Sequence, residues 1–82
     1  LNDEVILANA SGGGFTITLP TAASAKGKRL TIKAINVSGG NVTIDGDGSE
    51  TIDGATTKVL SVAQSAVTIC SDGTSWHILA AV

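Results

Sequence analysis

Leu30-Thr31-Ile32-Lys33-Ala34 is the stretch that decides the fold class, because its apolar side chains alternate with Thr and Lys. A period of two places alternate side chains on opposite faces of an extended chain, which is typical of a half-buried β-strand. The same alternation recurs in Phe15-Thr16-Ile17-Thr18-Leu19, Val42-Thr43-Ile44 and Val67-Thr68-Ile69. Because Thr and the β-branched aliphatic residues also favour strands, the sequence predicts an all-β fold.

Turn-forming residues separate these runs. Ser38-Gly39-Gly40-Asn41 joins the second run to the third, a short connection typical of a hairpin. The other breaks are Ser11-Gly12-Gly13-Gly14, Pro20, Asp45-Gly46-Asp47-Gly48, Asp53-Gly54 and Ser71-Asp72-Gly73-Thr74-Ser75. We expect a small antiparallel β-sandwich or an intertwined β-prism of about six or seven short strands.

Two other patterns are weaker. Residues 22–26 hint at a helix but are too few to form a stable one, so we expect a turn there. A Thr-Ile pair recurs along the chain, but its spacing is too uneven for a true repeat.

The size of the chain favours self-association. Its 82 residues form one domain, residues 1–82, and a chain of this length buries only about 60–65% of its surface on folding. Cys70 is the single cysteine and excludes an internal disulfide, while Phe15 and Trp76 are the only aromatic residues. Oligomerisation is a usual supplement to so thin a core.

The last strand is apolar on both faces. We expect Trp76, Ile78 and Ala80 on one face and His77, Leu79, Ala81 and Val82 on the other. A strand of this kind is typically buried on both sides. The sequence therefore predicts that part of the strand contacts a neighbouring subunit.

Charge and hydropathy exclude several partners. The net charge is −2, so nucleic acid is not expected, and the cluster Lys26, Lys28 and Arg29 is interpreted as a solvated turn. No run of about 18 apolar residues exists, so membrane insertion is not expected. The start at Leu1 has neither an initiator Met nor a signal-peptide pattern, which predicts a fragment of a longer protein.

The sequence predicts no enzyme, cofactor or metal site. His77 lies inside a strand with no catalytic motif around it. Five carboxylates could in principle form a glycosidase pair, but all lie in Gly-rich turns, where Asp bonds to local backbone. They are Asp45, Asp47, Glu50, Asp53 and Asp72.

Three residues leave a choice of interpretation. The segment from Asp45 through Asp47 to Glu50 begins like a calcium loop but lacks its later ligands, so we interpret it as an acidic turn. Cys70 is expected to be a small buried residue. Trp76 is either a core residue or an aromatic platform for a sugar.

Several longer stretches together resemble a module found near the C-terminal ends of bacteriophage tail fibres and tailspikes. The similarity runs from about Phe15 to Ile78, and its most specific parts are residues 48–54 and 71–76. These are Gly48-Ser49-Glu50-Thr51-Ile52-Asp53-Gly54 and Ser71-Asp72-Gly73-Thr74-Ser75-Trp76.

The resemblance implies an all-β domain that associates as a homotrimer, ends a fibre and in some proteins touches the host surface. It implies a place in the virion tail, outside the cell, and no catalytic residues. The expected function is therefore a structural trimerisation and distal-tip module, with a contribution to host attachment. The alternative is a carbohydrate- or receptor-binding module on a viral or bacterial surface protein. A host cell-surface glycan is the further partner that this interpretation suggests.

Overall fold

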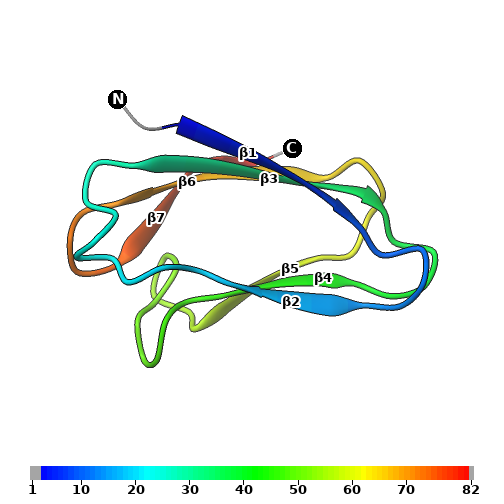
Figure 1. The fold of residues 1–82 in the computed structure, drawn as a ribbon, viewed down its shortest axis with the longest axis horizontal. Coiled ribbons are helices and arrows are strands. Elements are labelled where there is room, and N and C mark those ends of the chain that lie inside the picture. The colour runs from blue at the N-terminus through cyan, green and yellow to red at the C-terminus, as the bar shows by residue number, and fades with distance from the viewer. Residues whose placement is uncertain (1–2, 82) are drawn as a thin grey trace.

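The computed structural model describes residues 3–81, which form two packed β-sheets and contain no helix (Figure 1). The strands are β1 (Asp3–Asn9), β2 (Phe15–Thr18), β3 (Arg29–Asn36), β4 (Val42–Asp45), β5 (Thr57–Leu60), β6 (Ala66–Ser71) and β7 (Trp76–Ala81). The predicted all-β class and strand number are confirmed. Leu1, Asn2 and Val82, the last of which we expected in the final strand, lie outside the described residues.

Both sheets are mixed rather than antiparallel. One has the strand order β1-β3-β6-β7 and the other β2-β4-β5, with β1 parallel to β3 and β2 parallel to β4. The prediction of an antiparallel sandwich is wrong in this respect, and so is the hairpin at residues 38–41. That turn carries the chain from β3 in one sheet to β4 in the other. Alternation indicates which face of a strand is buried, but it does not indicate which strand lies beside it.

The parallel pairs come from an internal repeat. Strand β1, a turn and β2 are followed by β3, a turn and β4, which stack on them in parallel. Asn9 pairs with Asn36 and Phe15 with Val42, in each case 27 positions further along the chain. The Thr-Ile spacing did not indicate this equivalence, because it also counted strands outside the two units.

The two turns of the repeat have the same local geometry. The Oδ1 atom of Asn9 accepts the Ser11 N–H at 3.0 Å, and that of Asn36 accepts the Ser38 N–H at 2.8 Å. The turns also bond to each other, since the Gly39 N–H donates to the carbonyl of Ala10 at 2.9 Å. A Cβ at Gly39 would lie 2.4 Å from the Gly13 nitrogen, so the stacking requires glycine at position 39.

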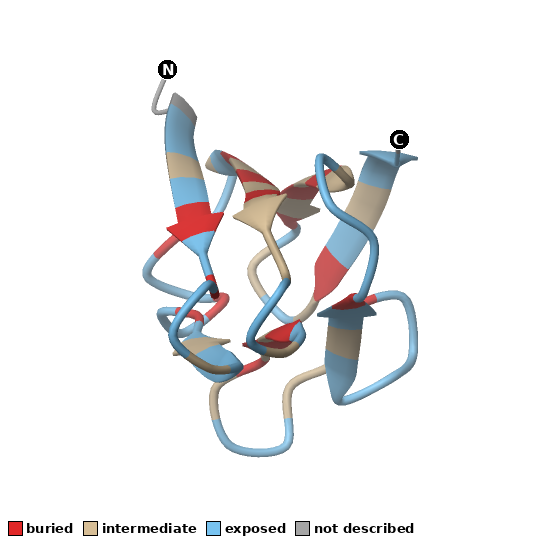
Figure 2. Ribbon diagram, turned by 90° about the vertical axis from the view of Figure 1, so that its right-hand side faces the viewer, coloured by how far each residue is buried: buried red, intermediate tan, exposed pale blue. Residues whose placement is uncertain are grey.

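The core between the sheets is thin. Among the described residues it holds fifteen buried apolar side chains, of which five are alanines and the largest is Trp76. Seven of them come from the inward faces of β3, β4 and β6, and the rest come from β1, β5, β7 and the loops, including Ile52 before β5. The view along the sandwich shows this buried layer between exposed strand edges (Figure 2).

Strand β7 departs from simple alternation. Ile78 pairs with Ile69 but Ala80 pairs with Thr68, so Leu79 has no opposite residue and the strand bulges there. The bulge turns Ala80 to the outer face of the sheet with Thr68 instead of leaving it on the face of Trp76 and Ile78. Beyond the bulge, β7 is exposed along Leu79–Ala81.

Candidate functional site

Residues 48–54 and residues 71–76 meet at the start of β7. The N–H of Trp76 donates to the Thr51 carbonyl at 2.8 Å, and the N–H of Asp53 donates to the Trp76 carbonyl at 2.9 Å. These bonds place Ile52 beside Trp76 as a short parallel bridge. Residues 51–53 therefore cover the first half of the β7 edge, which strand pairing within the sheet leaves open.

Trp76 is a core residue. Its side chain has no exposed surface and packs into the cluster between the sheets. Its Nε1 atom is buried and meets no hydrogen-bond acceptor within residues 3–81. The indole is therefore not displayed for stacking on a sugar ring, and Phe15, 39% exposed, is the aromatic side chain that reaches the surface of the described chain.

Glu50 and Ser71 together fix the turn at residues 21–26. The Oε1 atom of Glu50 accepts the Ala22 N–H at 2.9 Å, and the hydroxyl of Ser71 donates to the Ala22 carbonyl at 2.6 Å. Ser71 is buried, and its hydroxyl oxygen also accepts the Gly73 N–H at 3.1 Å. The expected turn at residues 22–26 is present, and these two distant side chains satisfy its backbone.

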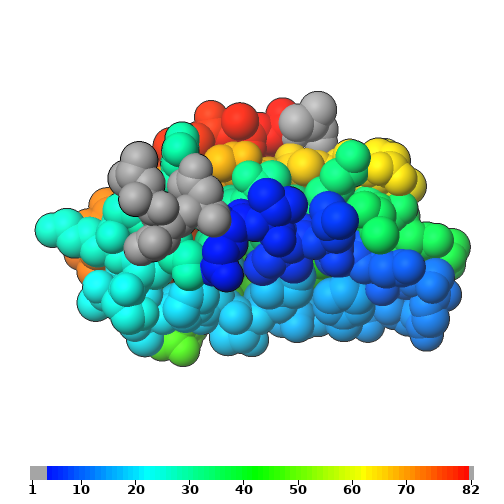
Figure 3. All heavy atoms as spheres, turned by 45° about the horizontal axis from the view of Figure 1, so that its top comes forward, coloured from blue at the N-terminus to red at the C-terminus, as the bar shows by residue number. Residues whose placement is uncertain are grey.

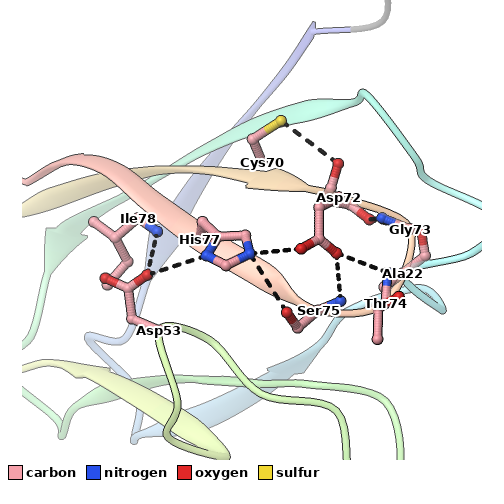
Figure 4. Close-up of polar contacts among 10 residues, drawn as sticks. Ala22, Asp53, Cys70, Asp72, Gly73, Thr74, Ser75, His77 and Ile78 are labelled. Atoms are coloured by element: carbon pink, nitrogen blue, oxygen red, sulfur yellow. Dashed lines mark hydrogen bonds and ion pairs between the residues drawn. The ribbon is translucent and has the colours of Figure 1, made fainter.

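His77 lies among polar side chains at the end of the β6–β7 hairpin (Figure 4). Its Nε2 atom is 2.8 Å from Oδ2 of Asp72 and 3.4 Å from the hydroxyl of Ser75. Its Nδ1 atom faces Oδ1 of Asp53 at 3.8 Å. The structure thus assembles a Ser-His-Asp set, which the sequence analysis did not expect.

This set lacks the geometry of a catalytic triad. The Asp72 carboxylate can only accept a hydrogen bond, so Nε2 of His77 must carry the hydrogen and donate it. That nitrogen therefore has no lone pair left to take a proton from Ser75. The Nδ1 to Asp53 distance exceeds a hydrogen bond, and the His77 side chain is 51% exposed to water. A general base needs a free lone pair directed at its nucleophile.

Asp72 is held in its ionised form by its own turn. Its Oδ1 atom accepts the N–H groups of Ser75, at 2.9 Å, and Thr74, at 2.8 Å. The Ser75 N–H, then His77 and then the Thr74 N–H hold the pKa of the Asp72 carboxyl well below its usual range. These contacts are local, so they stabilise the hairpin turn.

Hydrogen bonds fix the remaining acidic candidates at the end of β4 and in the loop that follows it. Asp45 ends β4, where its carbonyl accepts the Leu19 N–H at 2.8 Å, and the Asp47 carbonyl accepts the Glu50 N–H at 3.0 Å. Glu50 itself is directed at Ala22 rather than at the two aspartates. Within the described chain, no three His, Cys, Asp or Glu side chains are grouped closely enough to hold a metal ion.

The basic cluster is divided among different environments. Lys26 is exposed, whereas Lys28 is half-buried and forms an ion pair with Glu4. Arg29 begins β3 and lies level with Cys70 of β6 and His77 of β7. Cys70 is half-buried on the outer face of the sheet, rather than fully buried as expected.

The feature that the sequence analysis missed is a pair of apolar edges. Six large apolar side chains are exposed within residues 3–81, and they lie on the strands and turns at the two opposite edges of the sandwich. The first edge comprises β1, the turn at residues 11–14 and β2, and exposes Val5, Leu7 and Phe15. The second edge comprises β5, the turn at residues 61–65 and Leu79–Ala81 of β7, and exposes Val59, Val62 and Leu79. Figure 3 shows β1 and the turn that follows it lying open on the surface.

The sequence matches no protein-family model, and no curated protein is detectably similar to it. Between Asp3 and Ala81 there is no helix with the length and apolar character required to cross a membrane.

Proposed function

We propose that this chain is a structural module that assembles as a homotrimer at the distal end of a bacteriophage tail fibre or tailspike. The observation that carries the proposal is the exposure of Val5, Leu7, Val62 and Leu79, each 57–68% exposed in a single chain. Apolar side chains gathered on strand edges are typical of surfaces that other polypeptide covers.

The thin core supports the same assignment. A core in which five of fifteen buried apolar residues are alanines stabilises one copy weakly, and association adds buried area that the monomer lacks. The resemblance of residues 48–54 and 71–76 to fibre-tip modules favours the end of a phage fibre as the place where the trimer acts. In that setting the module holds three chains in register at the end of the fibre, outside the cell.

A primary role in glycan binding is less well supported. It would favour an exposed Trp76 in a groove with polar neighbours, and this side chain is fully buried. The observation that favoured the carbohydrate-binding alternative is therefore removed. Host attachment enters the proposal only as a property of the assembled tip.

Sedimentation equilibrium of the 82-residue chain at micromolar concentration tests the proposal. We expect a species of three times the 8.1 kDa chain mass. A single species of about 8 kDa across the concentration range would refute the assembly and, with it, the proposed function.

A further inference from the structure

We propose that the first edge of one copy packs against the second edge of the next copy, so that the copies form a closed ring. This inference rests on the proposed homotrimer and specifies the surfaces that build it. An interface of this kind is heterologous, because each copy contributes a different patch to each of its two contacts.

The distribution of apolar side chains points to this arrangement. If two copies met about a two-fold axis, a single self-complementary patch on each copy would form the contact. The second apolar patch of each copy would then remain exposed to water. Instead Val5 and Leu7, on the outer face of the edge strand β1, and Phe15 of β2 lie at one edge. Val59 of β5, Val62 of the following turn and Leu79 of β7 lie at the opposite edge. In a closed ring, one neighbouring copy covers the first patch and the other neighbouring copy covers the second.

The strand registers place the two patches at matching heights. In the four-stranded sheet, Val5 pairs with Thr31, Thr31 with Thr68 and Thr68 with Ala80, so Val5 is level with the open end of β7. In the three-stranded sheet, the same counting puts Phe15 level with Leu60. A rotation about an axis along the strands therefore brings apolar residues of one copy to those of the next.

The open end of β7 is the part of that strand that faces the contact. Residues 51–53 cover the β7 edge only as far as the Ile78 N–H, which Asp53 bonds at 3.0 Å. Beyond it, Leu79 is 57% exposed and lies next to Ala80, which is level with the exposed Val5 on the first edge.

Glycine usage in the stacked turns gives independent support. Gly39 and Gly40 must be glycine because the turn of the first unit lies against them, and a Cβ would come within 2.4 Å and 2.5 Å of its backbone, respectively. Their equivalents are Gly12 and Gly13, yet a Cβ at Gly12 would meet nothing within 4 Å. Gly12 also lacks the positive φ that would call for glycine. Its own chain thus gives no reason for glycine there.

The outer side of the second turn shows which residue type occurs where no other backbone lies nearby. Gly14 must be glycine because a Cβ there would lie 2.8 Å from the Asn41 backbone. Asn41 is the equivalent residue of the second unit; it is exposed and carries a side chain. The stack therefore keeps glycine where a neighbouring backbone approaches. Glycine at position 12 is explained if another backbone approaches the first edge as closely.

The second edge offers a complementary shape. A hollow of about 150 Å³ lies between β5, the turn at residues 61–65 and β6. Its lining is apolar at six positions, Val59, Leu60, Val62, Ala66, Val67 and Ala81, and polar at Lys58, Ser61 and Ser65. Because Phe15 is level with Leu60, its partly exposed ring is the side chain of the next copy that reaches this hollow. The turn at residues 61–65 lies at the same end of the sandwich as the turn that contains Gly12 (Figure 1).

A cysteine pair tests the contact directly. Thr16 and Val59 both pair with Thr43, so each lies on an edge strand at the same height. Within one chain β4 separates them, and two strand spacings of about 4.8 Å exceed the reach of a disulfide. A disulfide between the two cysteines introduced as T16C and V59C, in a Cys70→Ala background, must therefore join two copies.

We expect the double variant, after mild oxidation, to give covalent dimers and trimers that end at the trimer on a non-reducing gel. Each single-cysteine variant should remain monomeric on the gel, and a mixture of the two should yield dimers only. A double variant that sediments as a trimer but shows no cross-link would overturn the inference and leave the proposed function standing. Dimers from a single-cysteine variant would indicate a two-fold contact and overturn it as well.

A second variant does not depend on disulfide geometry. Gly12→Ala should leave the circular dichroism spectrum unchanged, because its Cβ has open space within its own chain. It should weaken trimer formation at least tenfold in dissociation constant, whereas the matched Asn41→Ala, on the far side of the stacked turns, should not. Equal association constants for the two variants would contradict the inference, and a wild-type chain that never exceeds the monomer mass would instead contradict the proposed function.

Discussion

Asp53 bonds the backbone of Ile78 across 25 positions of sequence, with its Oδ1 atom 3.0 Å from the Ile78 nitrogen. Asp53 has a positive φ of 50° and precedes Gly54, so the turn directs its side chain at the β7 edge. The bond satisfies an edge N–H that no strand pairs.

Loss of this edge bond should be measurable in two substitutions. Asp53→Ala removes the acceptor and places a residue with no local hydrogen-bonding side chain at positive φ, so we expect the free energy of unfolding to fall by about 2–3 kcal/mol. Asp53→Asn keeps the Oδ1 acceptor and tolerates positive φ, and should cost less than about 1 kcal/mol. Urea denaturation at fixed protein concentration measures both. Equal losses in the two variants would mean that the side-chain bond contributes nothing.

The sequence was sufficient for the fold class because alternation is a local signal. Leu30, Ile32 and Ala34 are all buried in β3, and Thr31 and Lys33 between them are half-buried and face outward, as their pattern indicates. Strand β1 was missed because Val5 and Leu7 are apolar on its exposed face, which hides the alternation. Strand β5 was missed because polar Lys58 is level with the buried Ile44 while apolar Val59 is exposed, which hides the alternation.

Alternation could not predict the strand order, because the parallel pairing depends on the turn at residues 11–14 stacking on the equivalent turn 27 residues later in the chain. The equivalence of Ser11-Gly12-Gly13 and Ser38-Gly39-Gly40 was the available signal. At the candidate site, the local role of Asp72 follows from its turn sequence. The contacts from Glu50 to Ala22 and from Asp53 to Ile78 join segments 25 or more residues apart, and no spacing rule predicts them.

The buried hydroxyl of Ser71 should contribute strongly to stability. Ser71→Ala leaves the Ala22 carbonyl without its 2.6 Å donor and the Gly73 N–H without its acceptor. A buried polar group that loses its partner costs about 1–3 kcal/mol, so we expect a loss in that range by urea denaturation. Ser49→Ala, at an exposed position outside both edges, serves as the control and should change the free energy of unfolding by less than about 0.5 kcal/mol.

Two substitutions of Trp76 separate the effect of its side-chain volume on the free energy of unfolding from the effect of its indole N–H. Trp76→Ala empties the largest buried side-chain position and should cost about 3–5 kcal/mol. Trp76→Phe removes a buried N–H that meets no acceptor in residues 3–81, which offsets part of the lost packing, so we expect about 1–2 kcal/mol. Circular dichroism should follow unfolding, because these variants lack the tryptophan signal. A phenylalanine variant as unstable as the alanine variant would show that the N–H is satisfied in solution.

Asp72 makes a pH-dependent contribution whose sign follows from its lowered pKa. A carboxyl that is more acidic in the folded chain than in the unfolded chain stabilises the fold fully above its unfolded pKa of about 3.9. That stabilisation is lost as the pH falls from there toward the folded pKa. The free energy of unfolding of wild type minus that of Asp72→Asn should therefore be constant above about pH 5 and shrink below about pH 4.

Asp47→Asn is the control, because the backbone carbonyl of Asp47 accepts the Glu50 N–H in its turn and the substitution keeps that bond. A wild-type advantage over Asp72→Asn that persists unchanged to about pH 2 would show that the turn N–H groups and His77 do not favour the ionised carboxylate.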